Sequence, residues 1–355
     1  AHDIARLFAA RGEAARFVCH AADEARREAN GETVTYVVNR NINYTNICTY
    51  SCTFCAFSKG PRKARGGDAP YLLDLGEVRA RAAEAWARGA SEVCLQGGIH
   101  PTFDGRTYLG ILEAVKAGAP DIHVHAFSPL EVTHGAATLG LDVEAYLQEL
   151  KSRGLGSLPG TAAEILTDPV RALICPDKLS ASAWLDVVRA AHTIGLPTTS
   201  TMMFGHVDGY EDWAVHLLRL LDLQRQTSGF TEFVPLPFVA QEAPIFRKGL
   251  SRAGPTYREA VLVHAVARLV FQGRIRNIQT SWVKMGMQGA KAALQAGAND
   301  LGGVLMNESI TRAAGAVHGQ EMSSATLMVA IASLGRTARQ RTTLYGVAAR
   351  EIQAA

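Results

Sequence analysis

Short apolar runs alternate with longer amphipathic segments along most of the chain. The short runs have the length and composition of β-strands, bounded by turn residues. Eight such runs are present, at residues 34–39, 92–96, 122–126, 156–159, 197–203, 230–235, 277–282 and 300–305. The pattern therefore predicts a protein built on many short strands separated by helices.

The intervening segments repeat apolar residues at helical spacing. Residues 75–90 place Val78, Ala82 and Ala85 on one stripe, and residues 183–195 end at Gly195, a typical helix C-cap. Residues 258–271 form a third long periodic segment. Residues 2–29 also have a helical pattern but precede the first strand, so they lie outside the alternation.

Strands that alternate with helices predict right-handed βαβ units around a parallel sheet. A repeat of eight favours a closed (β/α)₈ TIM-type barrel over an open, partial barrel. We therefore expect an α/β fold with two parts. Residues 1–33 form an N-terminal helical extension, and residues 34–355 form the barrel together with its C-terminal helices.

In such a barrel the active site lies at the C-terminal ends of the strands. Polar residues that follow the predicted strands are therefore candidates for the site. They are residues 41–46 and 96–100, with His125, Ser128, Glu131, Thr161, Glu164, His206, Glu232, Gln279, Ser281, Lys284, Asn307 and Glu308.

Composition and charge exclude several classes of partner. The 355 residues carry 36 Lys and Arg against 33 Asp and Glu, a net charge of +3. This balance argues against a nucleic-acid partner, and no apolar run is long enough for a membrane span. No secretory signal pattern opens the chain, so we expect a cytoplasmic protein with reduced thiols.

The cysteines carry the strongest chemical signal. Cys48, Cys52 and Cys55 form a CxxxCxxC pattern just after the first strand, whereas Cys19, Cys94 and Cys175 stand alone and are interpreted as small buried hydrophobic residues. Three thiolates on one short loop are typical of an iron–sulfur cluster and leave one iron of a cubane open.

Two other interpretations of these cysteines stay open at this point. A structural zinc site needs a complete tetrahedral ligand set, and no nearby Cys or His supplies the missing ligand. A redox dithiol would use only Cys52 and Cys55.

The cysteine pattern, with an aromatic residue before its last cysteine, resembles the signature of radical SAM enzymes. The resemblance implies a [4Fe-4S] cluster on Cys48, Cys52 and Cys55, whose open iron binds S-adenosylmethionine (SAM). It places Phe54 and Met203 near the adenine and Glu164 near the ribose. It also places Gln96, Gly97 and Gly98 at the methionine amino group.

Longer segments narrow the resemblance to the CofH family of deazaflavin FO synthases. They include NRNINYTNICTYSCTFCAFSKG (39–60), EVCLQGGIHP (92–101), DIHVHAFSPLEV (121–132), LPGTAAEIL (158–166), GFTEFVPLPF (229–238), NIQTSWVKMG (277–286) and GRTARQRTTLYG (335–346). The family cleaves the Cα–Cβ bond of L-tyrosine and adds the 4-hydroxybenzyl fragment to 5-amino-6-(D-ribitylamino)uracil. A CofG-type radical SAM partner then closes the ring, and an electron donor reduces the cluster. Related enzymes of the menaquinone futalosine pathway are the alternative.

This chemistry suggests roles for the remaining candidates. We expect a base among His100, His125 and His206, because a neutral tyrosine amine loses hydrogen more readily. The expected substrate-binding residues are Tyr44, Ser128, Glu232, Gln279, Ser281, Lys284, Asn307 and Glu308. Among these, Lys284 suits the tyrosine carboxylate, and amides and acids suit the hydrogen-bonding edges of the uracil. Neither substrate carries phosphate, so we expect Arg336, Arg339 and Arg341 to form a helix C-terminal charge pattern or salt bridges.

Overall fold

The computed structural model describes residues 1–60 and 69–348. Its strand pairs all run parallel. The strands are β1 (Thr33–Val37), β2 (Asn39–Asn43), β3 (Glu92–Gln96), β4 (His123–Ala126), β5 (Thr198–Phe204), β6 (Phe230–Pro237), β7 (Asn277–Ile278), β8 (Asp300–Gly303) and β9 (Thr337–Gln340).

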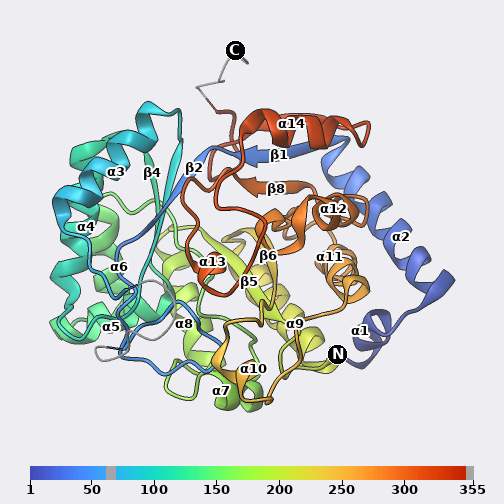
Figure 1. The fold of residues 1–355 in the computed structure, drawn as a ribbon, viewed down its shortest axis with the longest axis horizontal. Coiled ribbons are helices and arrows are strands. Elements are labelled where there is room, and N and C mark those ends of the chain that lie inside the picture. The colour runs from blue at the N-terminus through green and yellow to red at the C-terminus, as the bar shows by residue number, and fades with distance from the viewer. Residues whose placement is uncertain (61–68, 349–355) are drawn as a thin grey trace.

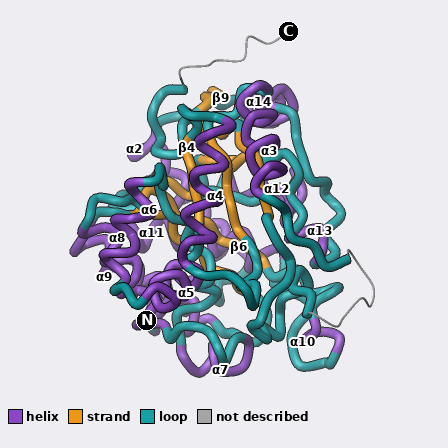
Figure 2. The backbone as a smooth tube through the Cα atoms, turned by 90° about the vertical axis from the view of Figure 1, so that its left-hand side faces the viewer, coloured by secondary structure: helices purple, strands orange, loops and turns teal. Residues whose placement is uncertain are grey.

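The strands close into a barrel. Only Val38 separates β1 from β2, so the two occupy one position in the ring. From there the pairing runs through β3, β4, residues 157–158, β5, β6, β7 and β8, and β8 returns to β1. The prediction of a closed (β/α)₈ barrel is therefore confirmed, and Figure 2 shows its strands running between an outer layer of helices.

Helices cover the outside of the barrel. Figure 1 shows α3 and α4 on one side and α2 and α11 on the other. The helices are α1 (His2–Phe8), α2 (Gly12–Asn30), α3 (Leu75–Ala87), α4 (Gly105–Gly118), α5 (Pro129–Leu139), α6 (Val143–Ser152), α7 (Asp168–Ile174), α8 (Ala181–Thr193), α9 (Tyr210–Thr227), α10 (Pro244–Arg247), α11 (Tyr257–Phe271), α12 (Trp282–Leu294), α13 (Ile310–Ala313) and α14 (Ser324–Ala332). In the part of the chain that the structure describes, every helix is too short or too polar to cross a bilayer.

The structure corrects several predicted boundaries. The expected strand 156–159 is reduced to single bridges at Ser157 and Leu158. The expected strand 277–282 ends at Ile278, because the chain turns there and Trp282 begins α12. The helical segment 2–29 is broken in two, because Gly12 adopts a positive φ of 53° at the start of α2.

The N-terminal helices share the core of the barrel. Phe8 of α1 is fully buried and packs edge-on against Trp213 of α9, with ring centroids 5.2 Å apart. Arg258 of α11 donates a hydrogen bond to the carbonyl oxygen of Phe8 at 2.8 Å. These contacts tie α1 to the outer helices of the barrel.

Strand β9 was not predicted, and it changes one end of the barrel. It pairs with β1 at the edge opposite β8, in the register Thr33↔Thr337 to Tyr36↔Gln340. Figure 2 shows β9 and α14 at one end of the molecule and α7 and α10 at the other. The residues that follow β9 are thereby brought to the N-terminal end of the strands.

Candidate active site

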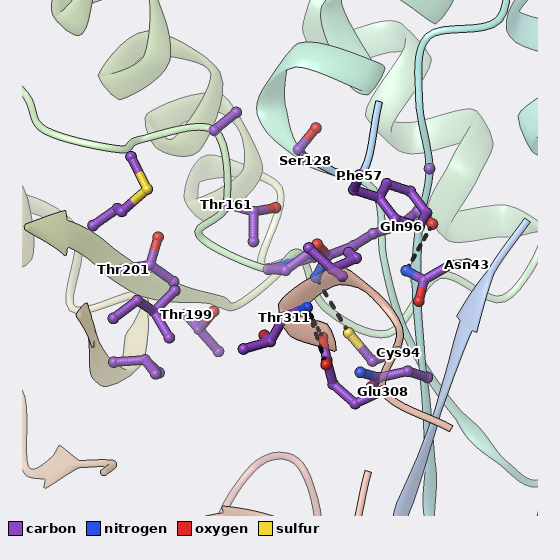
Figure 3. Close-up of a pocket in the computed structure, with 18 of the residues that line it drawn as sticks. Asn43, Phe57, Cys94, Gln96, Ser128, Thr161, Thr199, Thr201, Glu308 and Thr311 are labelled. Atoms are coloured by element: carbon purple, nitrogen blue, oxygen red, sulfur yellow. Dashed lines mark hydrogen bonds between the residues drawn. The ribbon is translucent and has the colours of Figure 1, made fainter. Parts of the chain in front are cut away.

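A cavity of about 400 Å³ lies inside the barrel. It extends from the cysteine loop to the N-terminal halves of the strands. Figure 3 shows Cys94 and Gln96 of β3 on one wall and Thr199 and Thr201 of β5 on the opposite wall. The cavity contradicts the interpretation of Cys94 as a plain buried residue, since Cys94 lines the cavity and accepts a hydrogen bond from Gln96 at 3.5 Å.

The cysteine loop is held from two sides by backbone hydrogen bonds. The N–H of Thr49 donates to the carbonyl of Ile99 at 2.9 Å, and the N–H of Thr53 donates to the carbonyl of Ile174 at 2.8 Å. The N–H of Ser51 donates to the Asp177 carboxylate at 2.8 Å. Segments far apart in the sequence therefore fix the loop at the C-terminal end of the barrel.

All three cysteines of the loop line the cavity. The N–H of Ile99 donates to Cys48 Sγ at 3.3 Å, and the N–H of Ser58 donates to Cys55 Sγ at 3.4 Å. Burial raises the pKa of Cys52 to about 12 and also raises the pKa of Cys55. These thiols therefore bind protons when free and would release them to a metal, as thiolate ligands do.

The donor set distinguishes between the metal sites considered above. Within residues 1–60 and 69–348, no three His, Cys, Asp or Glu side chains converge as ligands of a single metal ion. A structural zinc ion needs such a convergent ligand set. An iron–sulfur cubane differs, because each thiolate binds a different iron and N–H groups donate to the sulfurs. The cysteine loop fits that group.

The two glycines after Gln96 pack directly against the cysteine loop. A Cβ on Gly97 would lie 2.2 Å from the Tyr44 ring, and one on Gly98 would lie 2.2 Å from the carbonyl oxygen of Ile47. Only glycine fits at such distances, so the GG pair is required for the cavity wall. The close approach also leaves their backbone exposed to the cavity.

Glu131 lines the cavity beside the two glycines and holds this wall together. Its carboxylate accepts hydrogen bonds from the N–H of Gly97 at 3.3 Å, from Ser128 Oγ at 2.6 Å and from the Tyr44 hydroxyl. Tyr44 does not line the cavity, and its predicted substrate contact is replaced by this supporting role. Ser128 lines the cavity, but its hydroxyl is used in the N-cap of α5.

A partly buried ion pair lies beside the cysteine loop. Lys178 donates to Glu164 at 2.9 Å and lies 5.3 Å from the centre of the Phe54 ring. Burial lowers the pKa of Lys178, but Glu164 and Cys52 outweigh burial and leave the pKa above its ordinary value. Lys178 is therefore a fixed cation of the site. Sequence reasoning missed it because it follows α7 rather than a strand.

The other predicted cofactor-contact residues also line the cavity. Phe54, Gln96, Glu164 and Met203 are all part of its wall. The N–H of Met203 donates to the carbonyl of Glu164 at 2.7 Å, which joins these two segments of the wall.

The three histidines predicted as candidate bases lie in different places, and only one of them is at the cavity. His100 lies outside the cavity, where it bonds Thr102 at 2.9 Å, and His206 is buried against Asp208 at 3.0 Å. Only His125 lines the cavity, because it lies within β4 and points inward. Burial lowers the pKa of His125 to about 4, so its imidazole is neutral.

Three more of the predicted substrate contacts line the cavity. They are Ser281, Lys284 and Glu308, whereas Asn307 does not line it. Ser281 precedes α12 rather than lying on a strand, and the Glu308 carboxylate accepts from the N–H of Thr311 at 2.9 Å (Figure 3). Burial lowers the pKa of Lys284.

A second group of polar residues forms the floor of the cavity. It comprises Glu92, His125, Glu232, Gln279 and Arg341, all of which line the cavity. Glu232 was expected at the rim, but it is near the start of β6 and therefore lies deep. Glu92 and Arg341 were not predicted as site residues, because neither follows a strand that had been identified.

Family models match nearly all of the chain. The model described as "Radical SAM superfamily" matches residues 42–220, and the model described as "CofH/MqnC C-terminal region" matches residues 227–353. The solved structure of methylornithine synthase (PylB) superposes with a TM-score of 0.73 over 95% of this chain and 93% of that one, at 18% identity. The hydrogenase maturase HydG from Carboxydothermus hydrogenoformans gives 0.71 over 96% and 76%, at 15% identity. At these identities the structures support the fold alone.

Curated relatives are much closer in sequence. A 5-amino-6-(D-ribitylamino)uracil–L-tyrosine 4-hydroxyphenyl transferase from Methanopyrus kandleri is 52% identical over 92% of this chain and 88% of its own length. The Methanocaldococcus jannaschii protein of the same name is 49% identical, over 92% and 90%. FO synthase from Mycobacterium leprae is 49% identical over 96% of this chain, which spans only 39% of that protein. The chain therefore belongs to the radical SAM superfamily and, within it, to the family of 5-amino-6-(D-ribitylamino)uracil–L-tyrosine 4-hydroxyphenyl transferases.

Proposed function

We propose that the chain cleaves the Cα–Cβ bond of L-tyrosine and transfers the 4-hydroxybenzyl fragment to 5-amino-6-(D-ribitylamino)uracil. The observation that carries this proposal is the 52% identity to a transferase of that name over 88% of the relative's length. A cavity that joins a cysteine loop to a polar floor supports it, because two substrates must meet in one closed space.

The cysteine end of the cavity is suited to the cofactors. Cys48, Cys52 and Cys55 would hold a [4Fe-4S] cluster and leave one iron for SAM. Together these groups supply the 5′-deoxyadenosyl radical that starts the reaction. The exposed backbone of Gly97 and Gly98 would contact the methionine portion of SAM, and Phe54 would pack near its adenine.

The residues between the two ends of the cavity would hold tyrosine. Lys284 is a half-buried cation in the cavity wall and would pair with the tyrosine carboxylate. Because burial lowers its pKa, a bound carboxylate would stabilise its charged form. The apolar side chains of Met203, Val234 and Leu236 line the same cavity and would exclude water from the reacting atoms.

The proposed reaction also needs partners. We propose that an electron donor reduces the cluster and that a CofG-type radical SAM activity converts the adduct to FO. The FO synthases that this chain resembles are longer proteins, of which it spans 37% to 40%. A nucleoside-modifying enzyme of the menaquinone futalosine pathway is the alternative, because the second family model covers both groups.

The test is anaerobic turnover by the reconstituted enzyme. With SAM, dithionite, L-tyrosine and the ribitylaminouracil, we expect 5′-deoxyadenosine and the hydroxybenzyl adduct, identified by mass spectrometry. Cys52→Ser should lower iron content and reduce both products to background. Cys19→Ser is the matched control, since Cys19 lies on α2 and not at the cavity.

The outcomes separate the candidate functions. Deoxyadenosine without adduct would indicate a different acceptor. Turnover of an aminofutalosine-type nucleoside in place of tyrosine would establish the menaquinone alternative and overturn the proposal.

A further inference from the structure

The segment after β9 enters the N-terminal end of the barrel and becomes part of the cavity floor. The N–H of Arg341 donates to the carbonyl of Tyr36 at 2.8 Å, which continues the pairing of β9 with β1. The Arg341 side chain is 2% exposed and reaches the cavity. The segment after β9 thus contributes a side chain to the cavity.

Most of the charge of Arg341 is matched by one carboxylate. Its Nε donates to Asp300 Oδ2 at 2.5 Å and its Nη2 donates to Asp300 Oδ1 at 3.1 Å. This bidentate geometry fixes the plane of the guanidinium. The Tyr345 ring stacks on its face, 4.1 Å from the Arg341 Cζ atom.

Both side chains then meet at a single oxygen of Glu232. The Tyr345 hydroxyl donates to Glu232 Oε2 at 2.5 Å, and Arg341 Nη2 donates to the same oxygen at 3.3 Å. In the described part of the chain, the other oxygen, Oε1, has no hydrogen-bond partner. Since Glu232 lines the cavity, this oxygen is available to a ligand.

The two carboxylates that line the floor offer hydrogen-bond acceptors to a ligand. Glu92 also lines it, and Asn39 binds only the Oε1 atom of that carboxylate, at 2.9 Å. Asp300, which does not line the cavity, takes up two of the N–H donors of Arg341. Such a surface suits a ligand rich in N–H and O–H donors.

The depth of Glu232 in the cavity indicates which of the two substrates it contacts. Tyrosine must react next to SAM, at the cysteine end of the cavity. Glu232 precedes the C-terminal residue of β6, Pro237, by five residues, which corresponds to roughly 16 Å along a strand. The ribitylaminouracil offers ring N–H groups, amines and a polyhydroxylated chain, so it fits the floor.

We propose that Arg341 and Tyr345 are positioning residues for the acceptor: they hold Glu232 so that its free oxygen binds the donor groups of the ribitylaminouracil. This inference rests on the proposed function and extends it to the C-terminal segment. Neither residue needs to contact the reacting atoms.

The same contacts set the protonation of Glu232. Burial, Asp300 and Glu92 raise the pKa of Glu232, Arg341 and Tyr345 lower it, and together they leave the pKa at about 7. The ionised carboxylate is the better acceptor of hydrogen bonds. Acceptor affinity should therefore fall as the pH drops through neutrality, and loss of the Tyr345 hydroxyl should move this transition to higher pH.

The test is equilibrium binding of the ribitylaminouracil to the reconstituted holoenzyme across neutral pH. Tyr345→Phe should weaken binding roughly tenfold and shift the pH transition upward. Glu232→Gln should weaken binding and remove the transition. Tyr257→Phe, at a tyrosine 63% exposed on α11, is the matched control.

A second readout separates positioning from folding. Iron content and SAM binding, which depend on the cysteine end of the cavity, should match those of the Tyr257→Phe control, whereas a merely structural defect in Tyr345→Phe would lower them together with acceptor binding. Wild-type affinity and pH dependence in Tyr345→Phe would overturn this inference alone. Failure of the wild type to bind the ribitylaminouracil at any pH would overturn the proposed function as well.

Discussion

At the scale of single residues, the cavity wall depends on close backbone packing. Gly98 approaches the Ile47 carbonyl so closely that any side chain must displace the cysteine loop. Gly97 is pinned by Glu131 on one side and by the Tyr44 ring on the other. The wall that would meet SAM is thus positioned by its contacts with Ile47, Tyr44 and Glu131.

Gly98→Ala tests this packing. A Cβ would lie 2.2 Å from the Ile47 carbonyl oxygen and 2.9 Å from Cys48 Cβ, so we expect a loss of roughly 2 kcal/mol in the free energy of unfolding and a severe loss of SAM cleavage. Urea denaturation and deoxyadenosine formation measure the two effects. Gly110→Ala is the control, because its nearest neighbour is 3.6 Å away inside α4 and it should stabilise the protein by about 0.5 kcal/mol. Unchanged SAM cleavage in Gly98→Ala would show that the wall tolerates a shift.

At the scale of elements, α11 is fixed by a capping box that also reaches its neighbours. The Glu259 carboxylate accepts from the N–H of Thr256 at 2.7 Å, from Tyr210 of α9 at 2.8 Å and from Arg252 at 2.7 Å. The motif TYRE is visible in the sequence, but its partners on other elements are not. One carboxylate thus caps α11 and links it to α9.

Glu259 makes stability depend on pH. Burial would raise its pKa, but hydrogen bonds from Thr256, Tyr210 and Arg252 outweigh burial and lower the pKa to about 2. The stabilisation is therefore complete above the unfolded-state pKa of about 4.3 and is lost as the pH falls from there towards 2. Glu259→Gln should lose about 2 kcal/mol in the free energy of unfolding at neutral pH, and the difference from wild type should shrink in that acidic window.

Urea denaturation of the apo-protein at several pH values measures this difference. Glu144→Gln, at an exposed position on α6, should show almost none. A Glu259→Gln difference that stays constant down to the acid limit would contradict the assignment.

At the scale of the whole molecule, Asp300 joins parts of the chain that only the closed barrel brings together. Its carboxylate accepts from Thr35 of β1 at 2.5 Å and from Arg341 at 2.5 Å. It lies at the start of β8, whose pairing with β1 closes the ring. Closure of the barrel and formation of the cavity floor therefore both depend on the ion pair of Asp300 and Arg341.

Asp300→Asn should be strongly destabilising, because it leaves the Arg341 guanidinium buried with only part of its charge compensated. We expect a loss of about 3 to 5 kcal/mol in the free energy of unfolding. Asp222→Asn, which removes an exposed pair with Arg225, should cost less than about 0.5 kcal/mol. Equal unfolding midpoints in urea for the two variants would show that the ion pair does not stabilise closure.

The local pattern of the sequence was sufficient for the features that short segments encode. The alternation of strands and helices predicted the barrel because each unit buries its own apolar face. The spacing of Cys48, Cys52 and Cys55 identified the loop that carries the chemistry, since ligands on one loop need no distant partner. Salt bridges were also expected for Arg336 and Arg341, and both form, with Asp23 and Asp300.

Only the tertiary structure determines which residues form the floor of the cavity. Glu92, Glu232 and Arg341 are far apart in the chain, and they meet because β9 inserts beside β1 and leads the chain into the barrel. No local pattern encodes that meeting, because it depends on where a closed ring leaves an edge of β1 unpaired. For the same reason the sequence could not separate His125, which points inward from β4, from His100 and His206, which follow their strands but lie outside the cavity.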